Sequence, residues 1–122
     1  PLEVVTDQTS IPCDAVRLAE CTVLVGRRIA IDASLKGLYH YAMGPPISRF
    51  RYAKHIVDAA VDRGIIEPVE VRPVTSDHFP APAERPRYSA MDGRRLVETF
   101  DVTPSDWRAG IAEYLDGMVR AG

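Results

Sequence analysis

The sequence predicts a mixed α/β fold, because stretches with strand patterning and stretches with helical patterning follow one another along the chain. Short runs rich in β-branched and aromatic residues predict strands near residues 2–5, 38–42 and 69–74. Apolar residues at three- and four-residue spacing predict helices near 14–26, 48–63, 93–100 and 104–119. A chain of 122 residues suits one domain, so we expect a single lobe over residues 1–122.

Capping residues support these helix limits. Asp14 and Ser48 are suitable N-caps for the first two helices, and Thr103 followed by Pro104 is typical of the start of the last. Gly26 and Gly64 predict the ends of the first and second helices, since glycine readily adopts the left-handed conformation found there. Residues 29–36 match neither pattern.

Each helix has an apolar stripe that we expect to be buried. On the first helix the stripe comprises Ala15, Leu18, Ala19, Thr22 and Val23, and on the second Phe50, Ala53, Val57, Ala60 and Val61. The short third helix has Leu96 and Phe100, and the last has Trp107, Ile111, Tyr114, Leu115 and Met118. In the strand near 38–42, Tyr39 and Tyr41 share one face.

The composition is that of a globular protein, with 46% hydrophobic residues, 26% charged residues and a net charge of −2. This balance favours neither a nucleic-acid partner nor a membrane partner. Two cysteines are too few for a disulfide scaffold, so we expect reduced thiols in the cytoplasm. The chain opens on Pro1 and continues at once into a strand pattern, which predicts a part of a longer protein.

The chain by itself has no recognisable catalytic, metal or cofactor motif. Its three histidines are scattered, without metal-ligand spacing, and Cys13 has no base near it in the sequence. Isolated glycines do not form a phosphate-binding loop, so a complete dinucleotide fold is unsupported. We therefore expect no catalytic residue, no metal and no cofactor on this chain alone.

The stretch from residue 79 to residue 89 is the strongest candidate for binding. Pro80, Pro82 and Pro86 keep it extended, and Arg85 then places a fixed cation near Ser89. One interpretation is a substrate-binding lobe of a larger enzyme in which Arg85 holds an anion; another is a small interaction module that docks on a further domain. A solvated connecting loop is the third interpretation.

Several motifs, in order along the chain, resemble those of the dTDP-4-dehydrorhamnose reductase family, which belongs to the extended short-chain dehydrogenase/reductases. They are Val4-Val5-Thr6-Asp7-Gln8 with Pro12, Gly37-Leu38-Tyr39-His40-Tyr41-Ala42, Phe50-Arg51-Tyr52-Ala53 after Ser48, Pro80-x-Pro82-Ala83-x-Arg85-Pro86-x-Tyr88-Ser89, Met91-Asp92 and Trp107-Arg108-x-Gly110-Ile111. The resemblance covers nearly the whole chain. It implies the C-terminal substrate-binding lobe, with peripheral strands and without the N-terminal Rossmann half.

What the resemblance implies is a role in dTDP-L-rhamnose synthesis. The family reduces the 4-keto group of a dTDP-sugar with NADPH, which the N-terminal half binds, and that half also supplies the proton from a Tyr-x-x-x-Lys pair. Tyr41 and Tyr114 are not followed by such a lysine. The expected partners are the dTDP-sugar, the Rossmann half and a second copy in a homodimer. The chain alone is expected to be inactive, and the alternative is a reductase-like binding or regulatory subunit without turnover.

The resemblance also implies which residues contact the substrate. These are Gln8, Pro12, Arg85 and Ser89, with Arg85 on the diphosphate or nearby sugar-nucleotide oxygens. The alternative for Arg85 is an ion pair with Glu84 or a contact with a helix C-terminus. One departure lies at Arg49, where the family commonly has tryptophan, and another at Cys13, where threonine is usual.

Overall fold

The computed structural model describes residues 1–42, 44–103 and 106–121. Its elements follow in the order β1 (Leu2–Val5), β2 (Thr9–Ser10), α1 (Ala15–Ile31), the 3₁₀ turn η1 (Ala33–Leu35), β3 (Ile47–Ser48), α2 (Arg49–Asp62), β4 (Val71–Val74), the 3₁₀ turn η2 (Ser76–His78), α3 (Arg94–Phe100) and α4 (Trp107–Ala121). The predicted mixed α/β class is confirmed.

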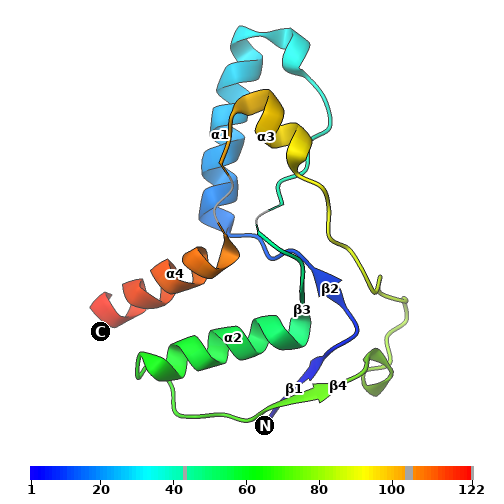
Figure 1. Cartoon of the computed structure of the whole chain (residues 1–122), viewed down its shortest axis with the longest axis vertical. Coiled ribbons are helices and arrows are strands. Elements are labelled where there is room, and N and C mark those ends of the chain that lie inside the picture. Colours follow the sequence, from blue (N-terminus) through cyan, green and yellow to red (C-terminus); the bar gives the residue numbers. More distant parts are fainter. Residues whose placement is uncertain (43, 104–105, 122) are drawn as a thin grey trace.

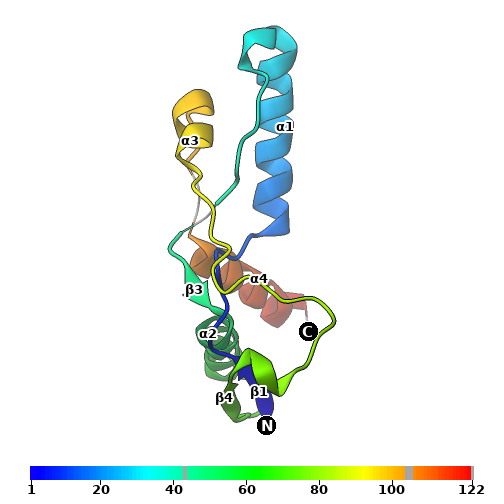
Figure 2. The ribbon, with the colours of Figure 1, turned by 90° about the vertical axis from the view of Figure 1, so that its right-hand side faces the viewer.

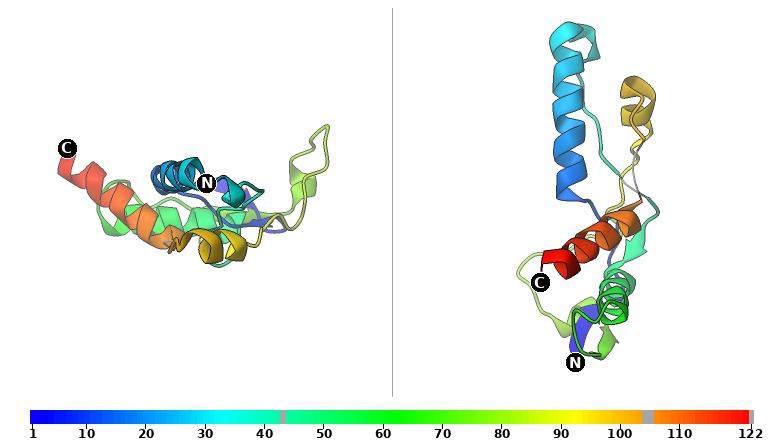
Figure 3. Two further views of the ribbon diagram at one scale, coloured as in Figure 1. Left: turned by 90° about the horizontal axis from the view of Figure 1, so that it is seen from above. Right: turned by 90° about the vertical axis from the view of Figure 1, so that its left-hand side faces the viewer.

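The molecule is elongated (Figure 1). Helices α1 and α3 form one end, while α2, β1 and β4 form the other, and α4 lies between them. Figure 2 shows the same division from the side, with the extended segments that precede β3 and α3 running between the two ends. Figure 3 shows that α1 and α3 project beyond the body that contains α2 and α4.

Two small sheets hold the end that contains α2. Strands β1 and β4 pair in parallel, with Leu2 opposite Val71, and β2 and β3 pair antiparallel, with Thr9 opposite Ser48. Thr9 also forms a parallel bridge to Tyr88. Strand β2 therefore has a neighbour on each of its two edges, although it is only two residues long.

The predicted caps of α1 and α2 are confirmed. The Asp14 carboxylate accepts from the backbone N–H groups of the first turn of α1, and the Ser48 hydroxyl oxygen accepts from the Arg51 N–H. Gly64 ends α2 with φ of +66°, and its N–H donates to the Val61 carbonyl at 2.8 Å. The next residue, Ile65, donates to the Ala60 carbonyl, which completes a Schellman motif.

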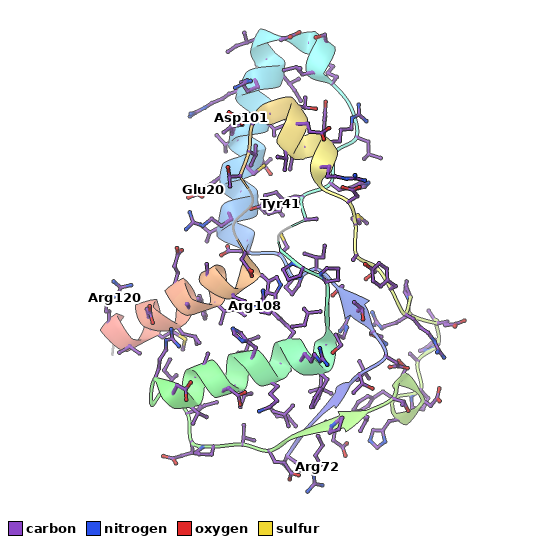
Figure 4. The ribbon with its side chains drawn as sticks, in the orientation of Figure 1. Glu20, Tyr41, Arg72, Asp101, Arg108 and Arg120 are labelled. Atoms are coloured by element: carbon purple, nitrogen blue, oxygen red, sulfur yellow. The ribbon has the colours of Figure 1, made fainter. Side chains whose placement is uncertain are left out.

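The buried side chains form two groups. Cys21, Leu96 and Phe100 pack between α1 and α3, together with the half-buried Tyr39 and Tyr41. Figure 4 shows Tyr41 beside α1, below α3 in this view. At the other end the buried residues of α2 and α4 are Val57, Ala60, Trp107 and Leu115, and these two helices contact each other.

The strand predicted at residues 38–42 is wrong. The segment is extended but is not a strand, because its aromatic side chains pack on helices instead of on a neighbouring strand. Tyr39 stacks edge-on against Phe100 and donates its hydroxyl to the Leu35 carbonyl at 2.7 Å. The Arg95 guanidinium donates to the Leu38 carbonyl, which occupies a backbone group that a sheet would otherwise pair.

Helix α1 also differs from its prediction. It continues through Gly26 to Ile31, and its inner face is formed by Cys21, Val25 and Ile29, while Leu18 and Val23 are exposed. The predicted face is wrong because apolar residues cover more than one side of this helix.

Helix α4 begins later than predicted, at Trp107, after Asp106, whose carboxylate accepts from the Arg108 N–H. Pro104 and Ser105, on which the predicted start depends, lie outside the described residues. On α4 the stripe is buried or half-buried at Trp107, Ile111 and Leu115, but Tyr114 and Met118 are exposed. No helix in the described ranges is both long and apolar enough to cross a lipid bilayer.

Candidate functional site

Backbone hydrogen bonds gather three distant segments around β2. On one edge, the Arg49 N–H donates to the Gln8 carbonyl at 3.0 Å. On the other edge, the Thr9 N–H donates to the Arg87 carbonyl at 2.8 Å and the Ser89 N–H donates to the Thr9 carbonyl at 2.9 Å. The start of α2 and the proline-rich stretch are thereby fixed on either side of one short strand.

A hollow of ≈ 220 Å³ lies at this junction. We call it the small hollow, and its lining residues are Gln8, Thr9, Ser10, Arg49, Arg85, Pro86 and Ser89. Three of the four residues predicted to contact substrate, Gln8, Arg85 and Ser89, therefore line the same hollow. They come from positions up to 81 residues apart, brought together by the pairing of β2.

Pro12, the fourth predicted residue, lies elsewhere. It lines a separate apolar hollow of ≈ 570 Å³ between the start of α1 and α4, with Tyr52, Trp107 and Tyr114 among its other walls. The structure does not bring Pro12 together with Gln8, Arg85 and Ser89. Its position follows from the chain direction, because the chain turns from β2 into α1 at this point.

Arg49 is a lining residue that the sequence interpretation noted only as a departure. The signal available in the sequence was the Ser48 N-cap, which places Arg49 at the first position of α2. That signal could not show that β3 would pair with β2 and bring this first turn beside Gln8. The register between β2 and β3, in which Thr9 lies opposite Ser48 although they are 39 positions apart in the sequence, is a tertiary property.

A second and larger hollow of ≈ 820 Å³ adjoins the small one and shares Gln8, Arg49 and Arg85 with it. We call it the large hollow. Its walls add Arg87, but they also add four acidic residues, Glu3, Asp7, Asp77 and Glu84. The large hollow is therefore mixed in charge, whereas the small hollow has two arginines and no acidic side chain in its lining.

A short polar network orients the Gln8 amide. The Gln8 Nε2 donates to the Ser76 Oγ at 3.0 Å, and the Ser76 hydroxyl donates to the Asp7 carboxylate at 2.8 Å. The Ser76 backbone N–H also donates to this carboxylate. These hydrogen bonds, that of the hydroxyl most of all, lower the pKa of Asp7, and the Arg87 charge acts in the same direction. With its nitrogen engaged, Gln8 retains a carbonyl oxygen as acceptor.

The arginines around the hollows are exposed and available. Eight ion pairs are formed among the described residues, and Arg49, Arg85 and Arg87 take part in none of them. A guanidinium is always charged and has five N–H donors in one plane. Each of these three arginines can therefore donate hydrogen bonds to an oxyanion.

The side chains of Tyr41, Tyr52 and Cys13, each with an ionisable hydroxyl or thiol, have a raised pKa. Burial raises the pKa of Tyr41 to about 12, and burial also raises the pKa of Tyr52. Burial, together with the neighbouring Asp14, raises the pKa of the Cys13 thiol, which keeps it protonated. Across the described ranges no three His, Cys, Asp or Glu side chains are grouped as a metal site. The arrangement is suited to binding an anion with hydroxyl-bearing groups beside it.

Relatives of known name share both sequence and fold with the chain. A model of the family described as "RmlD substrate binding domain" matches residues 1–120. A dTDP-4-dehydrorhamnose reductase from Aggregatibacter actinomycetemcomitans is 30% identical over 112 residues, which cover 90% of this chain and 38% of the relative. One from Mycobacterium tuberculosis (strain ATCC 25618 / H37Rv) is 32% identical over 115 residues, which cover 93% and 35%.

Among solved structures, a dTDP-4-dehydrorhamnose reductase from Clostridium acetobutylicum superposes with a TM-score of 0.77 at 30% identity, covering 96% of this chain and 38% of that one. A Bacillus anthracis reductase, solved in complex with NADP, gives a TM-score of 0.75 at 28% identity, covering 95% and 38%. The chain thus spans about two fifths of the length of its relatives. It belongs to the RmlD substrate binding domain family and corresponds to the C-terminal, substrate-binding part of dTDP-4-dehydrorhamnose reductases.

Proposed function

We propose that this chain is the substrate-binding lobe, over residues 1–122, of an NADPH-dependent dTDP-4-dehydrorhamnose reductase. In this role it positions the nucleotide-sugar for reduction of the 4-keto group in dTDP-L-rhamnose synthesis. The observation that carries the proposal is the shared position of Gln8, Arg85 and Ser89 around the small hollow. The names of the relatives supply the substrate class.

Each of the three residues has a chemical task. The Arg85 guanidinium donates two parallel hydrogen bonds to diphosphate oxygens, and the Ser89 hydroxyl donates a third. Gln8 offers its amide oxygen, held in place by Ser76, to a donor on the ligand. Pro82 and Pro86 on either side of Arg85 stiffen its segment, so that little ordering entropy is lost on binding. Pro12 stays outside this set because it lines another hollow.

The residues of this chain do not fit the cofactor. A dinucleotide site needs a glycine-rich turn between a strand and a helix, and the glycines here are isolated from one another. The proposal therefore gives NADPH and the proton donor to the Rossmann half and gives this chain the substrate. It follows that the chain alone neither binds NADPH tightly nor oxidises it. The proposal also places the complete protein in the cytoplasm, with its Rossmann half as the principal partner of this lobe.

The test is Arg85→Ala in the complete reductase. A hydrogen bond to a charged group contributes about 1.5–3 kcal/mol, so the KM for the dTDP-sugar should rise about 10- to 100-fold. The KM for NADPH should barely change, because the cofactor is bound by the other half. Arg51→Ala is the matched control: Arg51 is an exposed arginine on the first turn of α2 that lines neither hollow.

Two results would count against the proposal. If the substrate KM of Arg85→Ala stays within about twofold of the Arg51→Ala value in a folded enzyme, Arg85 is structural and the anion is held elsewhere. If the complete protein binds the dTDP-sugar but does not oxidise NADPH, the chain belongs to a binding or regulatory subunit without turnover. Both are read from absorbance of the reduced nicotinamide and from substrate binding.

A further inference from the structure

The small hollow differs from the rest of the surface in its charge. The chain has a net charge of −2, yet this hollow is lined by two arginines and no carboxylate. The large hollow beside it has four acidic residues. The two arginines of the small hollow attract an anionic group of a ligand. The uncharged part of the same ligand is then placed over the acidic side chains of the large hollow.

We propose that Arg49 is a second specificity-determining residue of the site, and that it binds the same anionic group as Arg85. We call these two arginine side chains the arms of the site. This inference rests on the proposed function and deepens it, because it names the small hollow as the diphosphate subsite and the large hollow as the place for the neutral, hydroxyl-bearing remainder. The diphosphate oxygens accept from guanidinium N–H groups, and the carboxylates of the large hollow accept from ligand hydroxyls.

The backbone places the two arms on different sides of the group. Arg49 follows β3, which pairs with one edge of β2, and its N–H is bonded to the Gln8 carbonyl. Arg85 precedes the segment that bonds to the other edge through Arg87 and Ser89. Both arms are therefore anchored to the same two-residue strand, and an anion in the small hollow lies within reach of both lining arginines.

Neither arm forms an ion pair within the described part of the chain. The ion pairs there use other basic residues: Arg17, Lys54, Arg63, Arg72, His78, Arg94 and Arg108. Arg49 and Arg85 are exposed in the absence of ligand, so both keep their donors for a diphosphate. Two guanidinium groups on one diphosphate also neutralise most of its charge, which makes binding sensitive to salt.

The test measures binding of three probes to the complete reductase by isothermal titration calorimetry. The probes are inorganic pyrophosphate, dTDP and uncharged thymidine. We expect Arg49→Gln and Arg85→Gln each to weaken pyrophosphate and dTDP binding about tenfold, with thymidine binding unchanged. Arg51→Gln, which removes the same charge two residues away and outside both hollows, should leave all three unchanged.

A double variant and a conservative variant sharpen the result. If both arms hold one anion, the loss in the double variant departs from the product of the two single losses by more than about twofold. Arg49→Lys keeps the charge without the planar fork, so it should recover part of what Arg49→Gln loses. Circular dichroism and the thermal midpoint of each variant confirm that the fold is intact.

Two outcomes would overturn the inference. If Arg49→Gln binds pyrophosphate as tightly as Arg51→Gln while Arg85→Gln does not, Arg49 is not an arm, and the proposed function stands on Arg85. If the unmodified reductase binds neither pyrophosphate nor dTDP, the small hollow is not an anion subsite. The proposed function is then judged separately by the substrate KM of Arg85→Ala in the complete reductase.

Discussion

Asp7 shows how one carboxylate joins two parts of the site. It follows β1, and it accepts from both the hydroxyl and the backbone N–H of Ser76, which lies beyond β4. Ser76 in turn accepts from the Gln8 amide. The Gln8 side chain, which lines the small hollow, is therefore held by Ser76, 68 residues later in the sequence. Ser76 is in turn held by the carboxylate of Asp7, the residue before Gln8.

This contact predicts a pH dependence of stability. The folded-state pKa of Asp7 lies below its unfolded value of about 3.9, so its stabilising effect is fully present above about pH 4 and is lost as pH falls through the folded pKa. We expect the free energy of unfolding in urea to fall less between pH 6 and lower pH for Asp7→Asn than for the unmodified chain. An equal fall in both would show that the contact contributes nothing.

A second experiment tests the hydrogen bond itself. Ser76→Ala should raise the pKa of Asp7 toward its ordinary value, as measured by the NMR titration of its carboxyl carbon.

Two glycines show how the helices end. Gly26 and Gly64 have the same chemical signature in the sequence, yet α1 continues through Gly26 while α2 stops before Gly64. A Cβ at either position would meet no atom within 4 Å. The difference lies in the backbone, because Gly64 has φ of +66° and Gly26 is inside a helix. Packing space therefore plays no part in how these two positions respond to a side chain.

We predict opposite effects of alanine at the two glycines. Gly26→Ala should stabilise the fold by about 0.8–1 kcal/mol, because alanine has the higher helix propensity. Gly64→Ala should destabilise it by about 1–2 kcal/mol, because an L-residue is strained in the left-handed conformation. The free energies of unfolding in urea give both values, and each variant is the control for the other. Shifts of the same sign would contradict this account.

At the scale of the whole molecule, the surface is large for the chain. The accessible area is 8486 Å², whereas a compact monomer of 13.5 kDa exposes about 6,500 Å². Part of the excess is apolar and lies on α1, where Val16, Val23 and Ile31 are exposed on one side of the helix. Tyr39 and Tyr41 do not contribute to this exposed surface, since both pack against the Cys21 group. Leu2 in β1 adds to the exposed apolar surface, at 47% exposure.

We predict that the isolated chain associates with itself through this side of α1. Exposed apolar surface of this size favours association, so light scattering at high concentration should give a mass above that of a monomer. Replacing Val23 and Ile31 together by serine should shift the mass toward the monomer. Leu38→Ser, which removes an exposed apolar residue from the extended segment, should not. A monomer mass for the unmodified chain at high concentration would contradict the prediction.

The features that depend on neighbours in sequence were predictable. Asp14, Ser48 and Gly64 act at the ends of their own helices, where capping involves residues two to four positions away. The stripe on α2 was also correct, with Val57 and Ala60 buried, because one side of that helix is clearly more apolar than the others. The ordered motifs of the chain indicated the family, which the match to residues 1–120 confirms.

Only the tertiary structure decided where the candidate site lies. The family resemblance named Gln8, Arg85 and Ser89 one by one. Thr9 had to pair with Ser48 on one edge and with the segment around Tyr88 on the other before these residues met with Arg49. The same applies to residues 38–42, whose aromatic pattern favours a strand until α1 and α3 offer a better apolar surface. Local sequence determines which conformation a segment prefers, whereas the partner that a segment meets depends on contacts between residues far apart in the chain, which no local pattern encodes.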